Sequence, residues 1–259
     1  MSIHYISYRL LLVLLSPLLL GHIIWLSISN RQGRYLLQRL GFGLSAIEPG
    51  QLWFHCASVG EVNTLLPLLK NLYSENNTLR FIITTNTVTG AQIVRQQKLD
   101  YLSHSYLPFD WSFSVNRFLT KVKPCFLYVV ETEIWPNLYT QCNRKGIPIY
   151  IINARLSSKT TSANSFVKKL LRYSLQKTDA IYARTEQDAE AYSVISGNED
   201  MVAVLGNLKF TTAITSSADR SQDVIPADRE YVLVASTHDD EEFQIYQAWK
   251  KLGRSELLL

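Results

Sequence analysis

The sequence predicts an α/β fold of the open, doubly wound type over about residues 48–210, and three observations predict it. Short runs of β-branched and aromatic residues alternate with segments of helical periodicity, which is the pattern of a sheet covered by helices. The runs show little alternation of apolar and polar residues, as expected for parallel strands that are buried on both faces. Polar clusters follow several of the runs, where ligands bind in open α/β sheets.

Residues 1–30 precede this fold and are predicted to form a membrane anchor. Leu10–Leu26 holds no charged residue, and as a helix it would reach about 25 Å, slightly short of the roughly 30 Å hydrocarbon core of a bilayer. Pro17 would weaken the helix and His22 interrupts its apolar surface. A signal peptide and a buried core helix are the alternatives, and an anchor can either span the bilayer or lie shallow in it. Trp25 suits the membrane interface.

Basic residues support the membrane interpretation. Those that follow the apolar segment are Arg31, Arg34 and Arg39, and a later helix face carries Lys168, Lys169, Arg172 and Lys177. By the positive-inside rule the arginines stay on the cytoplasmic side, together with the chain that follows them. Attraction to anionic lipid is one interpretation of both groups, and a solvated helix face is the other.

Six strands are predicted in the α/β domain. They are Gln51–Cys56, Arg80–Thr85, Cys125–Val130, Ile147–Ile152, Asp179–Ala183 and Val202–Leu205. A helix after the first strand carries one apolar stripe, made of Val62, Leu65, Leu66, Leu69 and Leu72. Pro136 suits the first turn of a later helix, and Thr185 is a suitable cap for another.

The C-terminal part of the chain predicts the beginning of a second domain. Residues 211–229 are polar, lack apolar periodicity and are interpreted as a linker. Within residues 230–259, a strand at Tyr231–Ala235 and a helix from about Asp239 to Lys251 precede the apolar end Leu257–Leu259. These elements make one βαβ unit, which is too small to bury a core alone. We therefore expect a second domain that is cut off within its second strand.

Composition excludes several classes of protein. The 259 residues carry 26 Lys plus Arg and 22 Asp plus Glu, a net charge of +4, and 47% are apolar. This balance argues against disordered, collagen-like and coiled-coil proteins. No nucleic-acid partner is expected, because a net charge of +4 is too small to argue for one by itself. The three cysteines are an odd number, which argues against a disulfide scaffold and a four-ligand zinc site. His55, His104 and His238 lack metal-ligand spacing, and we expect structural roles for them.

The cluster Ala57–Glu61 follows the first predicted strand. Gly60, in the run that also holds Ser58, lets the backbone approach a ligand, and the free amides of the helix start favour an anion. Glu61 lies in the first helical turn, where it is either a capping carboxylate or an acceptor of protons in catalysis. From the residues alone, capping is the commoner role.

A second cluster, Thr84–Gly90, follows the second strand. Its hydroxyls, among them those of Thr87 and Thr89, stand beside a glycine at a strand-to-helix turn. Such groups can cradle phosphate or sugar hydroxyls, and they also serve as simple caps and turn residues.

Two further clusters carry charge. Glu131 and Glu133 follow an apolar strand, and paired carboxylates can share a proton, bind a metal or pair with arginines. Arg155 follows the next strand in the run Asn153–Ser158. It can clamp an anionic ligand through two hydrogen bonds or form an ion pair with one of the two glutamates.

Taken in order, these clusters resemble a known family. His55–Glu61 is similar to the H-x-x-S-V-G-E signature of the Kdo transferases, which attach 3-deoxy-D-manno-octulosonic acid (Kdo) to lipid A precursor in Gram-negative bacteria. The further matching segments are Thr84–Gly90, Tyr106–Asp110, Glu131–Asn137, Asn153–Ser157, Gly206–Phe210 and Ser236–His238. Each match is weak alone, but seven in register are highly specific, and they cover essentially the whole chain.

The resemblance implies a GT-B glycosyltransferase, made of two Rossmann-like domains with a cleft between them. Residues 31–210 would be the acceptor-binding domain and residues 230–259 the start of the donor-binding domain. The implied donor is CMP-Kdo and the implied acceptor is the glucosamine disaccharide of lipid A precursor, on the cytoplasmic face of the inner membrane with its anionic lipids. Neither a cofactor nor a metal is expected.

The resemblance also assigns roles to residues. Glu61 corresponds to the general base of the family, which would make transfer an inverting displacement. The candidates for shaping the acceptor site are Ser58, Gly60, Thr87, Thr89, Glu131, Glu133 and Arg155.

Two departures from the family pattern bear on activity. Thr211 stands where many members have aspartate. The motifs with which the family holds its donor nucleotide lie beyond Leu259, so no donor-site residue is predicted. We therefore expect no turnover by this chain alone, as a truncated copy, a fragment or half of a split enzyme. The alternatives are a membrane-anchored module that binds lipid A precursor without catalysis, and an inactive fragment.

Overall fold

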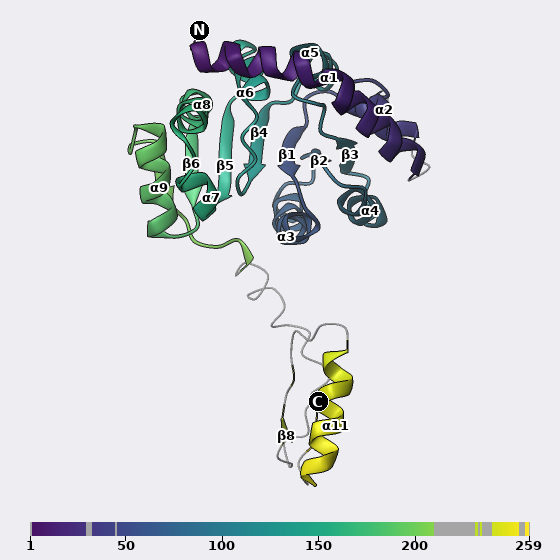
Figure 1. Cartoon of the computed structure of the whole chain (residues 1–259). Coiled ribbons are helices and arrows are strands. Elements are labelled where there is room, and N and C mark those ends of the chain that lie inside the picture. The colour runs from purple at the N-terminus through teal and green to yellow at the C-terminus, as the bar shows by residue number, and fades with distance from the viewer. Residues whose placement is uncertain are drawn as a thin grey trace. The chain divides into compact units, whose positions relative to one another are not determined.

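Apolar strands at the centre of the chain pair into one parallel sheet. The computed structural model describes residues 2–29, 33–44, 46–209, 231–232, 234, 240–253 and 257–258. The chain divides into two compact units, Met1–Ile214 and Thr215–Leu259 (Figure 1). The predicted linker at residues 211–229, like Thr211, Arg31 and the Ser236–His238 match, lies outside the described residues.

The sheet of the first unit has the order β3-β2-β1-β4-β5-β6-β7, and every neighbouring pair is parallel. The strands are β1 Leu52–Cys56, β2 Phe81–Thr85, β3 Leu102–Tyr106, β4 Phe126–Val130, β5 Ile149–Ala154, β6 Ala180–Ala183 and β7 Val202–Val204. The doubly wound α/β prediction is confirmed, and all six predicted strands are present. The order reverses between β1 and β4, and ligands of open α/β sheets bind outside the carboxyl ends of the strands at such a point.

Strand β3 is the one that the sequence did not predict. Its residues, Leu-Ser-His-Ser-Tyr, include only two apolar side chains. It lies at the edge of the sheet, where burial on both faces is not required, so its composition lacks the apolar signal of the central strands.

Helices cover both faces of the sheet (Figure 1). They are α1 Ile3–Ser29, α2 Gly33–Arg39, α3 Val59–Glu75, α4 Val88–Gln96, α5 Ser112–Val122, α6 Pro136–Arg144, α7 Ser158–Thr161, α8 Ser165–Leu175 and α9 Glu186–Ser196. The predicted apolar stripe lies on α3, Pro136 begins α6, and the Thr185 side chain caps α9 by accepting from the Asp188 amide.

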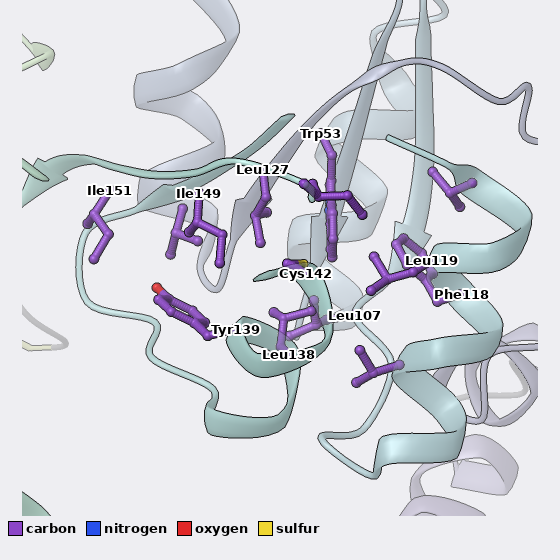
Figure 2. Close-up of a cluster of buried hydrophobic side chains, with 14 of the residues drawn as sticks. Trp53, Leu107, Phe118, Leu119, Leu127, Leu138, Tyr139, Cys142, Ile149 and Ile151 are labelled. Atoms are coloured by element: carbon purple, nitrogen blue, oxygen red, sulfur yellow. The ribbon is translucent and has the colours of Figure 1, made fainter. Parts of the chain in front are cut away.

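Alternate residues of the strands point into two separate cores. On one face, Trp53 and Leu127 are fully buried among side chains of α5 and α6, including Phe118 and Tyr139 (Figure 2). On the other face, Phe54 packs with apolar residues of α3 and α4. This double coverage fixes the strand register and so the positions of the loops at the carboxyl edge.

The N-terminal helix is longer than the predicted apolar run. Pro17 was expected to weaken the helix, but α1 continues through it from Ile3 to Ser29. Within the described part of the chain, α1 is the one helix with the length and apolar character of a membrane span. It belongs to the first unit, whose third core contains Ile23 together with Tyr35, Tyr106 and Trp111.

The second unit contains β8 Tyr231–Val232, α11 Glu241–Leu252 and β9 Leu257–Leu258. Strands β8 and β9 pair in parallel. A helix that connects two parallel strands is a βαβ unit, so the element predicted for residues 230–259 is present.

Candidate functional site

The charged clusters predicted from the sequence meet at the carboxyl edge of the sheet. Glu61 lies in the first turn of α3, directly after β1, and Glu131 and Glu133 follow β4. Because β1 and β4 are adjacent, the three carboxylates follow neighbouring strand ends at the place where the strand order reverses, which is where ligands bind in open α/β sheets. Arg155 follows β5, the next strand along, and joins them there.

Glu61 is held by the start of its own helix. Its Oε2 accepts a hydrogen bond from the Ala57 amide at 2.7 Å, and its Oε1 accepts one from the Ser58 hydroxyl at 2.8 Å. The Ser58 Oγ in turn accepts from the Glu61 amide at 3.3 Å. The residues thus form a reciprocal cap like the S-x-x-E capping box. The capping role that the residues alone suggested is therefore present, and both carboxylate oxygens keep further acceptor capacity.

The surroundings of Glu61 favour its protonated form more than water does. Burial raises the pKa of the carboxyl above its ordinary value, and the charge of Glu131 raises it further. Hydrogen bonds from Ser58 and Ala57, and the charge of His55, act in the opposite direction without cancelling the shift. Glu61 is 8% exposed, so its carboxyl combines burial with proximity to a second acid.

Glu133 has different partners from Glu61 and stays ionised. Its Oε2 accepts hydrogen bonds from Asn86 Nδ2 at 3.1 Å and from Trp135 Nε1 at 2.9 Å, and lies 3.6 Å from His55 Nε2. Burial alone would raise the pKa of Glu133, but its interactions with His55, Trp135 and Asn86 lower it overall. Whether Glu133 shares a proton with Glu131 stays a prediction.

Glu131 forms the ion pair with Arg155. The Arg155 Nε lies 3.1 Å from Glu131 Oε2, and the Arg155 side chain is 50% exposed. Of the two roles predicted for Arg155, the structure shows the ion pair with a glutamate. The exposed half of the guanidinium can still meet an anionic ligand.

The backbone at Glu131 is strained. Its φ of 62° lies in the left-handed region, which a non-glycine residue adopts at a cost of about 1 kcal/mol or more. Asn153, after β5, has a φ of 52°, but asparagine tolerates this conformation. Strain of this kind persists where the surrounding structure imposes it, and it is concentrated at functional edges.

We predict that Glu131→Gly leaves the protein as stable as the wild type or raises its free energy of unfolding by up to about 1 kcal/mol. Glycine relieves the left-handed strain, whereas the lost ion pair with half-exposed Arg155 is worth only about 0–1 kcal/mol. Urea unfolding measures the difference, with Glu131→Ala as the control that removes the ion pair and keeps the strain. A glycine variant less stable than the alanine variant would contradict the argument.

The remaining predicted residues lie at helix starts. Thr87 caps α4 by accepting from the Gly90 amide at 3.1 Å, and the exposed Thr89 hydroxyl donates to Thr87 Oγ1 at 3.4 Å. A Cβ added at Gly60 would meet only Ser58 Oγ, at 3.9 Å. Packing therefore does not require glycine there. Thr87 thus serves as a cap, as one of the two interpretations of this cluster expected. A role for these residues in ligand binding stays a prediction.

Sequence reasoning missed the residues that orient Glu133. His55 was expected to be structural, yet its buried ring joins Thr84 Oγ1, at 3.0 Å from Nδ1, to Glu133. Arg39 Nη1 donates to Asn86 Oδ1 at 3.2 Å and to the Leu107 carbonyl at 2.6 Å. Two signals pointed to His55: its position near the carboxyl end of a central strand, and its place in the segment that resembles the H-x-x-S-V-G-E signature. Within the described residues, no group of three or more His, Cys, Asp and Glu side chains is arranged to hold a metal ion.

The chain is similar in sequence to proteins of one family. The family profile described as "3-Deoxy-D-manno-octulosonic-acid transferase (kdotransferase)" matches residues 34–212. The chain is 33% identical over 252 residues to a 3-deoxy-D-manno-octulosonic acid transferase of Haemophilus influenzae, with 95% of this chain and 59% of that protein covered. A transferase of the same name from Aquifex aeolicus is 31% identical, with 80% of this chain and 52% of that protein covered. The chain thus spans little more than half the length of these relatives.

Among solved structures, a putative UDP-N-acetylglucosamine 2-epimerase from Listeria monocytogenes superposes with a TM-score of 0.53 at 14% sequence identity. The match covers 82% of this chain and 62% of that one. At this identity the likeness concerns the fold alone. With the parallel sheet described above, it confirms the predicted α/β fold of GT-B type.

Proposed function

Because the chain belongs to the 3-deoxy-D-manno-octulosonic-acid transferase family, we propose that it takes part in the transfer of Kdo from CMP-Kdo to a lipid A precursor in lipopolysaccharide biosynthesis. The first unit would supply the acceptor side of the site. One observation carries the proposal. Glu61, Glu131 and Glu133 gather with Arg155 at the reversal of strand order, which is where a sheet of this topology binds its ligands.

Glu61 is proposed as the general base. It would take the proton of the acceptor hydroxyl as that oxygen forms a bond to the anomeric carbon of the donor. The bond from this carbon to CMP breaks in the same displacement, which inverts the carbon. CMP leaves as a stable anion and needs little help from an acid. The raised pKa of Glu61 supports this role, because a base works best when its pKa approaches the working pH.

The neighbouring residues would position the acceptor. The exposed half of Arg155 suits a phosphate or carboxylate of an anionic sugar lipid. Ionised Glu133, held by Asn86 and Trp135, offers acceptor oxygens to sugar hydroxyls. Ser58, Gly60, Thr87 and Thr89 stay candidates for contacts at the helix starts. No metal or cofactor is part of the proposal.

The apolar helix α1 is compatible with membrane association. We place the protein on the cytoplasmic face of the inner membrane, where a lipid acceptor is within reach. The basic residues of α8, including Lys168 and Lys169, support contact with anionic lipids.

A hybrid protein tests the function. Residues 1–209 of this chain would be joined to the C-terminal part of the Haemophilus influenzae relative, which is longer than this chain. Kdo transfer from CMP-Kdo to lipid A precursor is measured with purified hybrid, and circular dichroism verifies folding. We expect transfer by the hybrid and none by the 259-residue chain. A folded hybrid that binds the lipid acceptor without transferring Kdo would favour the alternative of a non-catalytic binding module.

The pH dependence of the hybrid follows from the state of Glu61. A general base must be ionised, so the rate rises with pH through its pKa and is level above it. Since burial raises this pKa, the acid limb should lie above the ordinary glutamate value of about 4.3. Rates measured from pH 4 to 8 show the limb. A limb at or below the ordinary value would contradict the environment described for Glu61.

A further inference from the structure

Helix α1 is packed against the first unit along its length. Buried or half-buried side chains recur at intervals of three or four residues, and they include Tyr5, Tyr8, Leu12, Ser16, Leu19, Ile23 and Ser27. This spacing defines one face of a helix. Tyr5 is 1% exposed and Ile23 is 0% exposed, so the two ends of this inner face are buried as fully as its unit's core.

A polar clasp fixes the N-terminal end of the helix; we define the clasp as Tyr5, Tyr8, Asp110 and Asn137. The Tyr5 hydroxyl donates to Asn137 Oδ1 at 2.7 Å, and the Tyr8 hydroxyl donates to Asp110 Oδ2 at 2.8 Å. Asp110 also accepts from the amides of Asn137 and Leu138 at 2.9 and 2.7 Å, at the start of α6. Asp110 and Asn137 are 4% and 1% exposed, so the groups that accept these hydrogen bonds are themselves buried.

The far end of the helix is held by apolar contacts. Ile23 packs in the core that contains Tyr35 of α2, Tyr106 of β3 and Trp111. Tyr5 and Ile23 are about 27 Å apart along the helix axis. The helix is therefore attached to one folded unit at two points whose separation nearly equals the roughly 30 Å thickness of a bilayer's hydrocarbon core.

The outer face of α1 is apolar and exposed. Its large side chains at least 38% exposed are Ile3, Ile6, Leu10, Leu11, Val13, Leu14, Leu15, Leu18, Ile24, Trp25 and Ile28. Exposed apolar side chains that gather in this way along one helix mark a site of interaction rather than ordinary protein surface. The sequence between Leu10 and Ser29 adds no charge to it.

We propose that α1 lies flat in one leaflet of the membrane, held to the rest of the first unit by Asp110 and Asn137, and does not cross the bilayer. A crossing helix would have to leave the unit that buries both of its ends. The inference deepens the proposed function and rests on its membrane association. It also gives Asp110 and Asn137, which lie in segments that resemble family motifs, a positioning role outside the acceptor site.

A leaflet is the occupant that the surroundings favour. The exposed side chains are mostly aliphatic, and Trp25, 62% exposed, suits the interface. At the other end, the His4 ring lies 5.6 Å from that of Phe166, which is followed in α8 by Lys168 and Lys169. Cations beside an apolar surface match a membrane with anionic head groups.

Cysteine labelling tests the topology with the full chain expressed in Escherichia coli. Ser2→Cys is introduced together with Cys125→Ser, and a membrane-impermeant maleimide is added to spheroplasts or to inverted inner-membrane vesicles. The parent chain, whose Cys125 is exposed, marks the side of the folded unit. A flat helix keeps the introduced thiol on that same side, so we expect labelling in inverted vesicles and none in spheroplasts. Labelling of the introduced thiol from the spheroplast side overturns the proposal.

The clasp is tested separately by Tyr5→Phe combined with Tyr8→Phe. Removing both hydroxyls should speed amide hydrogen exchange in residues 3–12, whereas the control Tyr246→Phe, in α11, leaves that exchange unchanged. Equal exchange in the double variant and the wild type overturns the clasp.

Flotation of the protein with vesicles of anionic phospholipid tests whether a membrane covers α1. Failure to float removes the proposed membrane association. If a second copy of the chain covers the helix instead, the protein forms a dimer and does not float.

Discussion

Replacing Glu61 by glutamine is expected to lower Kdo transfer by the hybrid protein about 10²–10⁴-fold, the usual contribution of a general base. Glutamine has the same shape and can still accept the hydrogen bond that the Ala57 amide donates at 2.7 Å, but it does not take up a proton. The cap of α3 should therefore survive while proton removal is lost. The measurement is the turnover rate with saturating CMP-Kdo and lipid A precursor.

The control for this experiment is Glu75→Gln, at the exposed end of the same helix. It removes an equal charge at the opposite end of α3 from Glu61 and should leave the rate unchanged. Thermal unfolding of both variants verifies that the fold is kept. A Glu61→Gln hybrid that transfers Kdo at near the normal rate would assign Glu61 to capping alone.

The second large effect concerns stability. Phe118→Ala is expected to lower the free energy of unfolding by about 3–5 kcal/mol, because it removes a ring from the packed core and leaves a cavity. Phe118 is fully buried, and its ring centroid lies 4.8 Å from that of Trp53 (Figure 2).

Phe113, in the same helix, is the matched control. It is 56% exposed, so Phe113→Ala should change the free energy of unfolding by no more than about 0.5 kcal/mol. Urea unfolding of the 259-residue chain measures both variants. Equal losses in the two would mean that α5 does not pack on the sheet through Phe118.

Much of the fold could be predicted because buried strands have an apolar composition that the sequence shows. The central strands are apolar on both faces, so β1, β2, β4 and β5 were visible as β-branched and aromatic runs. Edge strand β3 lacks that mark, and its polar residues concealed it. Helix α1 was visible as an apolar run, but which of its faces meets the protein depends on Asp110 and Asn137, which are remote in the sequence.

The acidic residues of the candidate site could be predicted from the sequence, but their partners could not. Glu61, Glu131 and Glu133 come directly after predicted strands, and the topology of a parallel sheet brings the ends of its strands together. Pairing was left open, since whether Arg155 meets Glu131 or Glu133 depends on side-chain directions. His55 was set aside because a lone histidine carries no spacing signal, and its place beside Glu133 emerges only from the register of β1 against β4.

The hydrogen bond from Tyr5 to Asn137 has a consequence for the synthesis of the chain. The two residues are 132 positions apart, so α1 leaves the ribosome well before its docking partner has been made. At about 5–20 residues per second this interval is on the order of ten seconds. During that time the nascent chain exposes both faces of an apolar helix. The lipid surface or a chaperone has to cover this helix until α6 has been synthesised and can pack against it.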